Sequence, residues 1–152
     1  MRTLTLAVLC LLAFTATALA KGPTEAVVSG PGLREPLRLT WPSDGRSGSP
    51  MEVLVNGGGF FQVAAGGQSN RILRRSPTAR LGRRYLVRYL FPRPSGPGDW
   101  VRQELYPFAK GGPVTYTPPR QRMYGASRTR GGWFRATPRL TRVLLAVGLP
   151  RP

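Results

Sequence analysis

Histidine is absent from this 152-residue chain, and cysteine occurs only once, as Cys10. Histidine is the usual acid–base group near neutral pH and the commonest metal ligand. Its absence excludes Ser-His-Asp and Cys-His catalysis and every zinc site that uses histidine. A single cysteine cannot form an internal disulfide, so a folded domain here must rely on an apolar core.

Carboxylates are also scarce. The chain has six of them: Glu25, Glu35, Asp44, Glu52, Asp99 and Glu104. A glycosidase needs two carboxylates facing one substrate bond. Asp99 and Glu104 are the only close pair in the second half, and their odd spacing on a strand places them on opposite faces. We therefore expect a non-enzymatic protein with no catalytic residue, cofactor or metal, and keep an uncommon hydrolase as a third hypothesis.

The first 20 residues have the composition of a secretory signal peptide. Arg2 supplies the positive start, residues 4–19 are apolar, and Ala18-Leu19-Ala20 precedes Lys21 as a small-x-small cleavage site. We expect cleavage after Ala20 and a single secreted domain over residues 21–152, extracellular or associated with the cell envelope. An uncleaved anchor is the weaker interpretation, because a membrane-spanning helix needs about 20 mostly apolar residues.

The charge is strongly positive. The whole chain carries a net charge of +17, and loss of Arg2 with the signal peptide leaves +16. Only Lys21 and Lys110 are lysines, so the charge is almost entirely arginine. Arginine binds phosphates and carboxylates in a bidentate manner, and such a field attracts polyanions. Anionic cell-wall polymers or a membrane surface are the expected partners, while the codon usage of a GC-rich genome is the alternative origin of the arginines.

Two segments, 71–84 and 120–135, concentrate arginine, and we expect both to be exposed loops. The candidate polyanion-binding residues in them are Arg71, Arg74, Arg75, Arg122, Arg128 and Arg130. No recognised nucleic-acid motif accompanies them, so no specific nucleic acid is expected. The alternative is that both segments are simply solvated charge runs.

Alternating apolar and polar residues predict the strands. Residues 85–91 are the strongest case, and a Pro/Gly-rich turn over 92–98 leads to a second strand over 100–106 that pairs with the first. Shorter strands are predicted over 24–29, 36–40 and 114–117.

A capping box predicts a short internal helix. Ser49 stands three residues before Glu52, with Pro50 between them at the first helical position. The alternative is a hairpin that turns at 56–59, because Asn-Gly favours hairpin turns. A second helix is predicted from Pro138 to Gly148 near the C-terminus. The predicted fold class is α+β: a small antiparallel sheet with one short internal helix and a C-terminal helix.

Several short stretches carry a resemblance to known sequences. These are DWVRQELYPFAKGG at 99–112, GPVTYTPP at 112–119, GGW at 131–133, SGPGL at 29–33 and GLP at 148–150. In these stretches the chain resembles uncharacterised small secreted proteins of high-GC Gram-positive bacteria, which have no assigned activity. The resemblance implies a shared small secreted domain, and it implies no activity or site.

An aromatic face is the alternative functional surface. The candidate residues are Arg102, Glu104, Tyr106, Tyr116 and Trp133. Aromatic rings with a charged pair suit a saccharide or an extended peptide, which predicts a ligand-binding module near Tyr106 and Trp133. The structural interpretation is that these rings only close one end of the sheet, since aromatic residues mostly serve cores.

Overall fold

A seven-stranded sheet organises residues 22–152, the part of the chain that the computed structural model describes. The strand order is β2-β1-β4-β5-β6-β9-β3, and all neighbours are antiparallel. The strands are β1 (Glu25–Ser29), β2 (Leu37–Thr40), β3 (Ile72–Leu73), β4 (Tyr85–Phe91), β5 (Asp99–Tyr106), β6 (Val114–Thr117) and β9 (Gly132–Arg135). The predicted signal peptide and its cleavage site after Ala20 lie outside the described residues.

The central hairpin of β4 and β5 follows the predicted alternation. Tyr85, Val87, Tyr89 and Phe91 are fully buried on one face of β4, and the residues between them are half-buried or exposed. On β5 the same alternation buries Asp99, Val101, Gln103 and Leu105. Each strand therefore contributes one side to the core and presents the other side away from it.

The capping box forms and starts the internal helix. The Ser49 hydroxyl accepts a hydrogen bond from the Glu52 backbone N–H at 3.2 Å, and the Glu52 carboxylate accepts one from the Gly48 N–H at 2.6 Å. Helix α1 (Pro50–Glu52) runs on into one turn of π-helix, η1 (Val53–Gly57). The helical interpretation is therefore confirmed, and the alternative hairpin is wrong.

Gly59 separates η1 from helix α2 (Phe60–Ala64), so the chain stays helical beyond the Asn-Gly pair. Its φ of 65° lies in the left-handed region, which favours glycine. A Cβ atom at this position would approach the Phe134 ring to 2.2 Å. Only glycine fits here, because the tertiary structure brings β9 directly against this turn.

Helix α3 (Pro138–Ala146) confirms the predicted C-terminal helix. Its buried residues, Leu140 and Leu144, face the core. Gly148 follows the C-cap residue with a φ of 108°, and the Leu149 N–H donates to the Leu144 carbonyl at 2.9 Å in a Schellman arrangement. Thr137 occupies the N-cap position, but its side chain makes no capping hydrogen bond.

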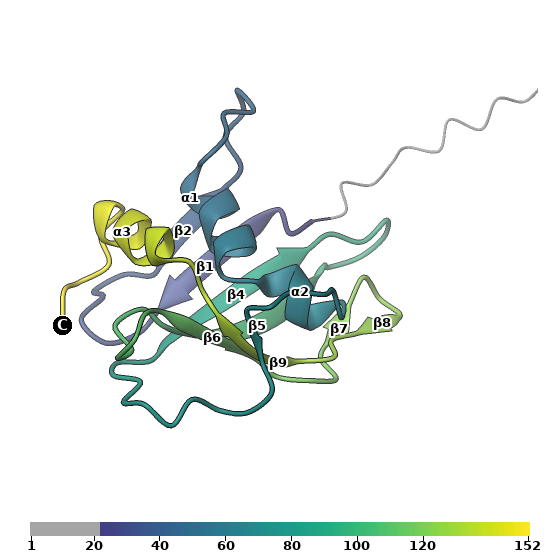
Figure 1. Ribbon diagram of the computed structural model, residues 1–152. Coiled ribbons are helices and arrows are strands. Elements are labelled where there is room, and N and C mark those ends of the chain that lie inside the picture. The colour runs from purple at the N-terminus through teal and green to yellow at the C-terminus, as the bar shows by residue number, and fades with distance from the viewer. Residues whose placement is uncertain (1–21) are drawn as a thin grey trace, which may run out of the picture.

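All the helices lie on one face of the sheet (Figure 1), where they form the main core. Phe60 from α2 packs against Tyr89 and Phe91 of β4, with ring centroids 4.5 and 5.5 Å away. Among the residues that the structure describes, the other face of the sheet carries no helix. The predicted α+β class, with an antiparallel sheet, an internal helix and a C-terminal helix, is confirmed.

Both arginine-rich segments contain more structure than predicted. Within 71–84, Ile72 and Leu73 form the edge strand β3, which pairs with β9. Within 120–135, the chain forms β9 and a small separate hairpin of β7 (Arg122–Met123) and β8 (Ser127–Arg128). The loop prediction is therefore wrong for these pieces. Their strands are two to four residues long, and β3 and β9 take partners far along the chain, so alternation within the segment could not reveal them.

Candidate functional site

The side of the sheet away from the helices, here called the outer face, carries all five residues of the predicted ligand face. Paired residues of antiparallel strands share one face, so the register places Glu104 beside Tyr116 and Tyr116 beside Trp133. Tyr106 lies two residues beyond Glu104 on the same side of β5. Arg102 lies on this side as well, but its paired neighbour is Arg88 of β4.

The three aromatic rings of the outer face form a contiguous array. Trp133 lies between the other two, with ring centroids 5.9 Å from Tyr106 and 4.8 Å from Tyr116. Tyr106 is buried, and Leu73 and Leu81 pack against the same cluster. The rings therefore pack against one another and form a small apolar cluster on the outer face with Leu73 and Leu81.

Glu104 binds partners other than the one expected. Its carboxylate accepts a hydrogen bond from the Tyr106 hydroxyl at 2.6 Å and lies 3.6 Å from the Arg84 guanidinium. Burial, followed by this hydrogen bond, raises the pKa of Tyr106 to about 12. The Arg102 backbone instead hydrogen-bonds the Gln121 side chain. The Tyr106 hydroxyl therefore stays a hydrogen-bond donor to the Glu104 carboxylate, and this bond holds the Tyr106 ring in place.

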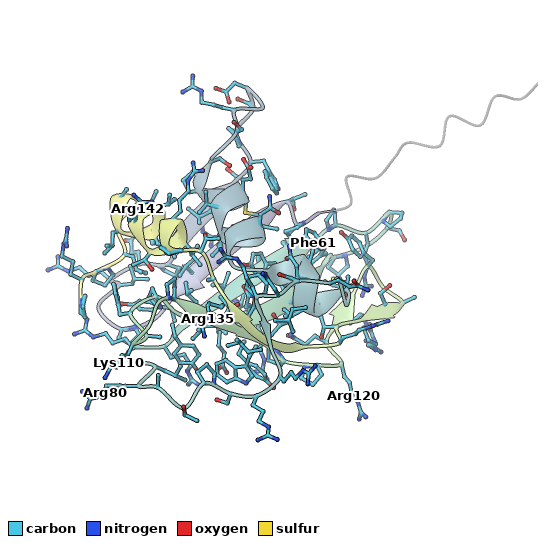
Figure 2. All side chains as sticks on the ribbon, in the orientation of Figure 1. Phe61, Arg80, Lys110, Arg120, Arg135 and Arg142 are labelled. Carbon is cyan, nitrogen blue, oxygen red and sulfur yellow. The ribbon has the colours of Figure 1, made fainter. Side chains whose placement is uncertain are left out.

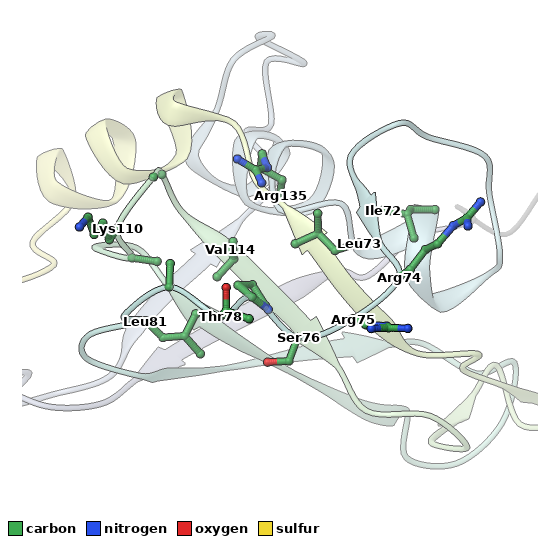
Figure 3. Close-up of a pocket in the computed structure, with 15 residues that line it drawn as sticks. Ile72, Leu73, Arg74, Arg75, Ser76, Thr78, Leu81, Lys110, Val114 and Arg135 are labelled. Atoms are coloured by element: carbon green, nitrogen blue, oxygen red, sulfur yellow. The ribbon is translucent and has the colours of Figure 1, made fainter.

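A hollow of about 500 Å³ adjoins this aromatic cluster (Figure 3). We call it the basic hollow, and its four cations are Arg74, Arg75, Lys110 and Arg135. Its apolar floor is formed by Ile72, Leu73, Leu81, Ala109 and Val114. Figure 3 shows Leu73 and Val114 in the middle, with Lys110 toward one end and Arg74 and Arg75 toward the other.

Distant parts of the chain build the basic hollow. Arg74 and Arg75 follow β3, Lys110 follows β5, and Arg135 ends β9. The Arg135 N–H donates to the Arg71 carbonyl at 2.8 Å, and the Lys110 N–H donates to the Arg80 carbonyl at 2.9 Å. The first bond attaches the residue before β3 to the end of β9, and the second attaches the loop after β3 to the turn after β5, so the cations are held around one space.

A second hollow of about 400 Å³ lies next to the first and shares Gly111, Gly112 and Arg135 with it. It adds Arg71, whose guanidinium donates to the Ala136 carbonyl at 3.5 Å. The two hollows together bring the predicted Arg71, Arg74 and Arg75 to one place.

No carboxylate lines either hollow. Within residues 22–152, the ion pairs are Arg38–Glu25, Arg46–Asp44, Arg84–Glu104 and Arg93–Asp99, so none neutralises a cation of the basic hollow. All four of its cations are exposed. The uncompensated positive charge can therefore act on an anion in solution.

The second predicted arginine set lies elsewhere. Arg122 and Arg128 face each other across the β7–β8 hairpin, and Arg130 follows it. None of the three lines the basic hollow. Arg120 at the start of this segment lies far from Lys110 and Arg80 in Figure 2. Arg71, Arg74 and Arg75 thus line the two hollows, and Arg122, Arg128 and Arg130 line neither of them.

Lys110 and Arg135 were not predicted as site residues. Arg135 ends the arginine-rich segment 120–135 and lies two residues after Trp133, and Lys110 precedes the Gly111-Gly112 pair. Neither signal identifies a site until β9 is paired with β3 and β6.

Asp99 has a structural role in the fold. It is 5% exposed, hydrogen-bonds the Arg93 guanidinium and accepts a hydrogen bond from the Gly125 N–H at 2.6 Å. The Arg93 hydrogen bond is the largest cause that holds the pKa of Asp99 below its usual range. Glu104 lies on the opposite face of β5, as predicted. In residues 22–152, no group of three or more acidic, histidine or cysteine side chains is placed to hold a metal ion.

Comparison with known proteins finds no matching family model, no matching curated protein and no matching solved structure. The resemblance to secreted proteins of high-GC bacteria therefore stays a prediction. Among the described residues, no helix combines the length and the apolar character that a membrane span requires.

Proposed function

We propose that the protein is exported, is not an enzyme, and binds anionic polymers of the cell envelope through the basic hollow. The observation that carries this proposal is the gathering of Arg74, Arg75, Lys110 and Arg135 around one space with no carboxylate among its lining residues. Arginine presents a planar fork that matches phosphate and carboxylate oxygens, and three of the four cations are arginines.

The net charge supports the same proposal. A chain with a charge of +17, or +16 once Arg2 leaves with the signal peptide, attracts any polyanion over a Debye length, which is about 8 Å at physiological salt. General attraction does not distinguish a site from the rest of the surface. The proposal therefore makes a narrower claim, namely that the hollow contributes more to binding than equal charge elsewhere.

The test is binding of soluble inorganic polyphosphate, measured by isothermal titration calorimetry at several salt concentrations. The hollow variant is Arg74→Gln/Arg75→Gln/Arg135→Gln. Affinity should fall steeply with salt in the unmodified protein, because each neutralised phosphate releases counterions. The hollow variant should bind more weakly and show a shallower salt dependence.

Two matched variants remove three charges outside the hollow. One is Arg34→Gln/Arg38→Gln/Arg46→Gln, and the other is Arg122→Gln/Arg128→Gln/Arg130→Gln. Both should lose less affinity than the hollow variant. Equal losses in all three would show that only net charge matters and would overturn the proposed site.

Export has its own test. When the full chain is produced in a secreting bacterial host, intact-mass measurement of the extracellular protein should show a chain that begins at Lys21. Full-length protein recovered from the membrane fraction would contradict export.

A further inference from the structure

The floor of the basic hollow differs in chemistry from its rim. Leu73 and Leu81 are half-buried, while Ala109 and Val114 are buried beneath them. These residues belong to a small apolar cluster with Tyr106 and Trp133 that is separate from the main core. The hollow therefore offers apolar surface at its centre and positive charge around it (Figure 3).

A plain polyanion and a neutral apolar molecule would each use only one part of this combination. A hydrophilic polyanion would pair with the arginines but would leave the exposed parts of Leu73 and Leu81 in contact with water. A neutral apolar molecule would cover the floor and gain nothing from the cations. Only a ligand that places an anionic group beside an apolar chain uses both parts, because burial of apolar surface and charge pairing then add.

We propose that the basic hollow binds a single-chain anionic amphiphile, with its phosphate or carboxylate head on the cations and its chain on the floor. This inference rests on the proposed function, since it uses the same cations, and it deepens that function by naming the ligand class. The volume of about 500 Å³ lies in the range of roughly 300–1,000 Å³ of small-molecule sites. A site of this size suits one chain rather than a two-chain lipid.

Cations stand at both ends of the apolar floor, so the anionic head group has two possible positions. Lys110 stands toward one end, and Arg74 and Arg75 toward the other. Two adjacent arginines can offer several N–H donors to one phosphate, whereas lysine acts as a point charge. We therefore place the head at Arg74 and Arg75 and the chain along Leu73, Val114 and Leu81.

Dodecyl phosphate, used below its critical micelle concentration, is the probe. Inorganic phosphate tests the head alone, and dodecyl maltoside tests the chain with a neutral head. Binding to the secreted protein is measured by calorimetry. Dodecyl phosphate should bind at least about tenfold more tightly than either control, since burial of apolar surface adds to charge pairing. Equal affinity for inorganic phosphate, or for dodecyl maltoside, would overturn the proposal.

Variants separate this inference from the proposed function. Leu81→Ser should weaken binding of dodecyl phosphate and leave polyphosphate binding unchanged, while Leu81→Met should retain both. Arg74→Gln/Arg75→Gln should weaken the binding of both ligands. The control Leu90→Ser removes a leucine from the outer face that does not line the hollow, and it should change neither affinity.

Leu73→Thr serves as the second floor variant where Leu81→Ser fails to fold, which thermal unfolding reports. Unchanged dodecyl phosphate affinity in a folded floor variant would overturn the amphiphile inference alone. An affinity for polyphosphate that is unchanged in Arg74→Gln/Arg75→Gln would instead overturn the proposed function. The two failures are therefore distinguishable.

Discussion

The two faces of one sheet differ in burial in this protein. On β4, Tyr89 is fully buried against the helices, and the adjacent Arg88 is exposed on the outer face. On β5, Gln103 is buried, and Trp100 is 45% exposed. The same strands thus serve both faces through a period of two residues. The helix-covered face holds the fold together, and the outer face is free to carry charge.

The outer face is itself divided. Around β6, β9 and β3 it is partly covered by the Tyr106–Trp133 cluster and the loop that forms the basic hollow. Around β4 and β5 it is open, and Arg88 stands opposite Arg102. Arg88 also lies 5.3 Å from the centroid of the Trp100 ring, in a cation–π arrangement. Charge is therefore carried by both parts, but only one of them surrounds it with a hollow.

The largest expected difference between the faces is in packing. Phe60→Ala removes a fully buried ring that contacts Tyr89 and Phe91, and it should lower the free energy of unfolding by about 3–5 kcal/mol. Trp100→Ala on the outer face should cost about 1 kcal/mol or less. Urea denaturation measures both. Similar losses would mean that the outer face belongs to the core.

The next effect comes from a polar group inside the covered face. The Gln103 amide accepts a hydrogen bond from the Tyr89 hydroxyl at 2.9 Å and donates to the Gly58 carbonyl at 3.3 Å. Gln103→Leu should cost about 1–3 kcal/mol, because the buried Tyr89 hydroxyl and Gly58 carbonyl lose a partner. The double variant Gln103→Leu/Tyr89→Phe should be milder than the sum of the two single variants. Simple additivity in urea denaturation would contradict this coupling.

Acid dependence probes the ion pair of Asp99, a buried residue at the start of β5. Since Arg93 holds the pKa of Asp99 below its usual range, the ionised form is favoured in the folded state. The resulting stability is present above the unfolded pKa of about 3.9 and is lost as the pH falls through the lower folded value. Asp99→Asn should therefore be less stable than the unmodified protein at pH 5–7, and the gap should close below about pH 4.

The matched control for this pH effect is Asp44→Asn. Asp44 pairs with Arg46, but its side chain is 52% exposed. The control should show a much smaller gap in thermal unfolding at every pH, since exposed ion pairs contribute little. A gap for Asp99→Asn that stays constant from pH 7 to pH 3 would show that its charge does not stabilise the fold.

The smallest effect concerns the open part of the outer face. Like charges directly opposite on neighbouring strands are destabilising. Arg102→Gln should therefore raise stability by about 0.2–0.5 kcal/mol at low salt, with the gain shrinking as salt screens the charges. Arg38→Gln, which loses its 2.6 Å pair with Glu25, should not be stabilising. A loss of stability in Arg102→Gln would show that Arg88 and Arg102 do not repel each other.

The local signals in the sequence predicted much of the fold. The alternation over 85–91 and 100–106, the capping box at Ser49 and the glycine at 148 each act within a few residues, so they form as expected. Alternation also explains why four aromatic-face residues lie on the outer face, because side chains two apart on a strand share one side. They are Glu104, Tyr106, Tyr116 and Trp133.

The sequence by itself thus determined the central strands, the two helical regions, the positive charge and the absence of histidine chemistry. Only the tertiary structure decided that Leu73 pairs with Trp133 and that Arg74, Arg75, Lys110 and Arg135 surround one hollow. The physical reason is the distance along the chain over which each effect acts. Propensity, capping and alternation act between near neighbours. The pairing of β3 with β9 joins segments about 60 residues apart, and its backbone hydrogen bonds do not depend on which side chains are present.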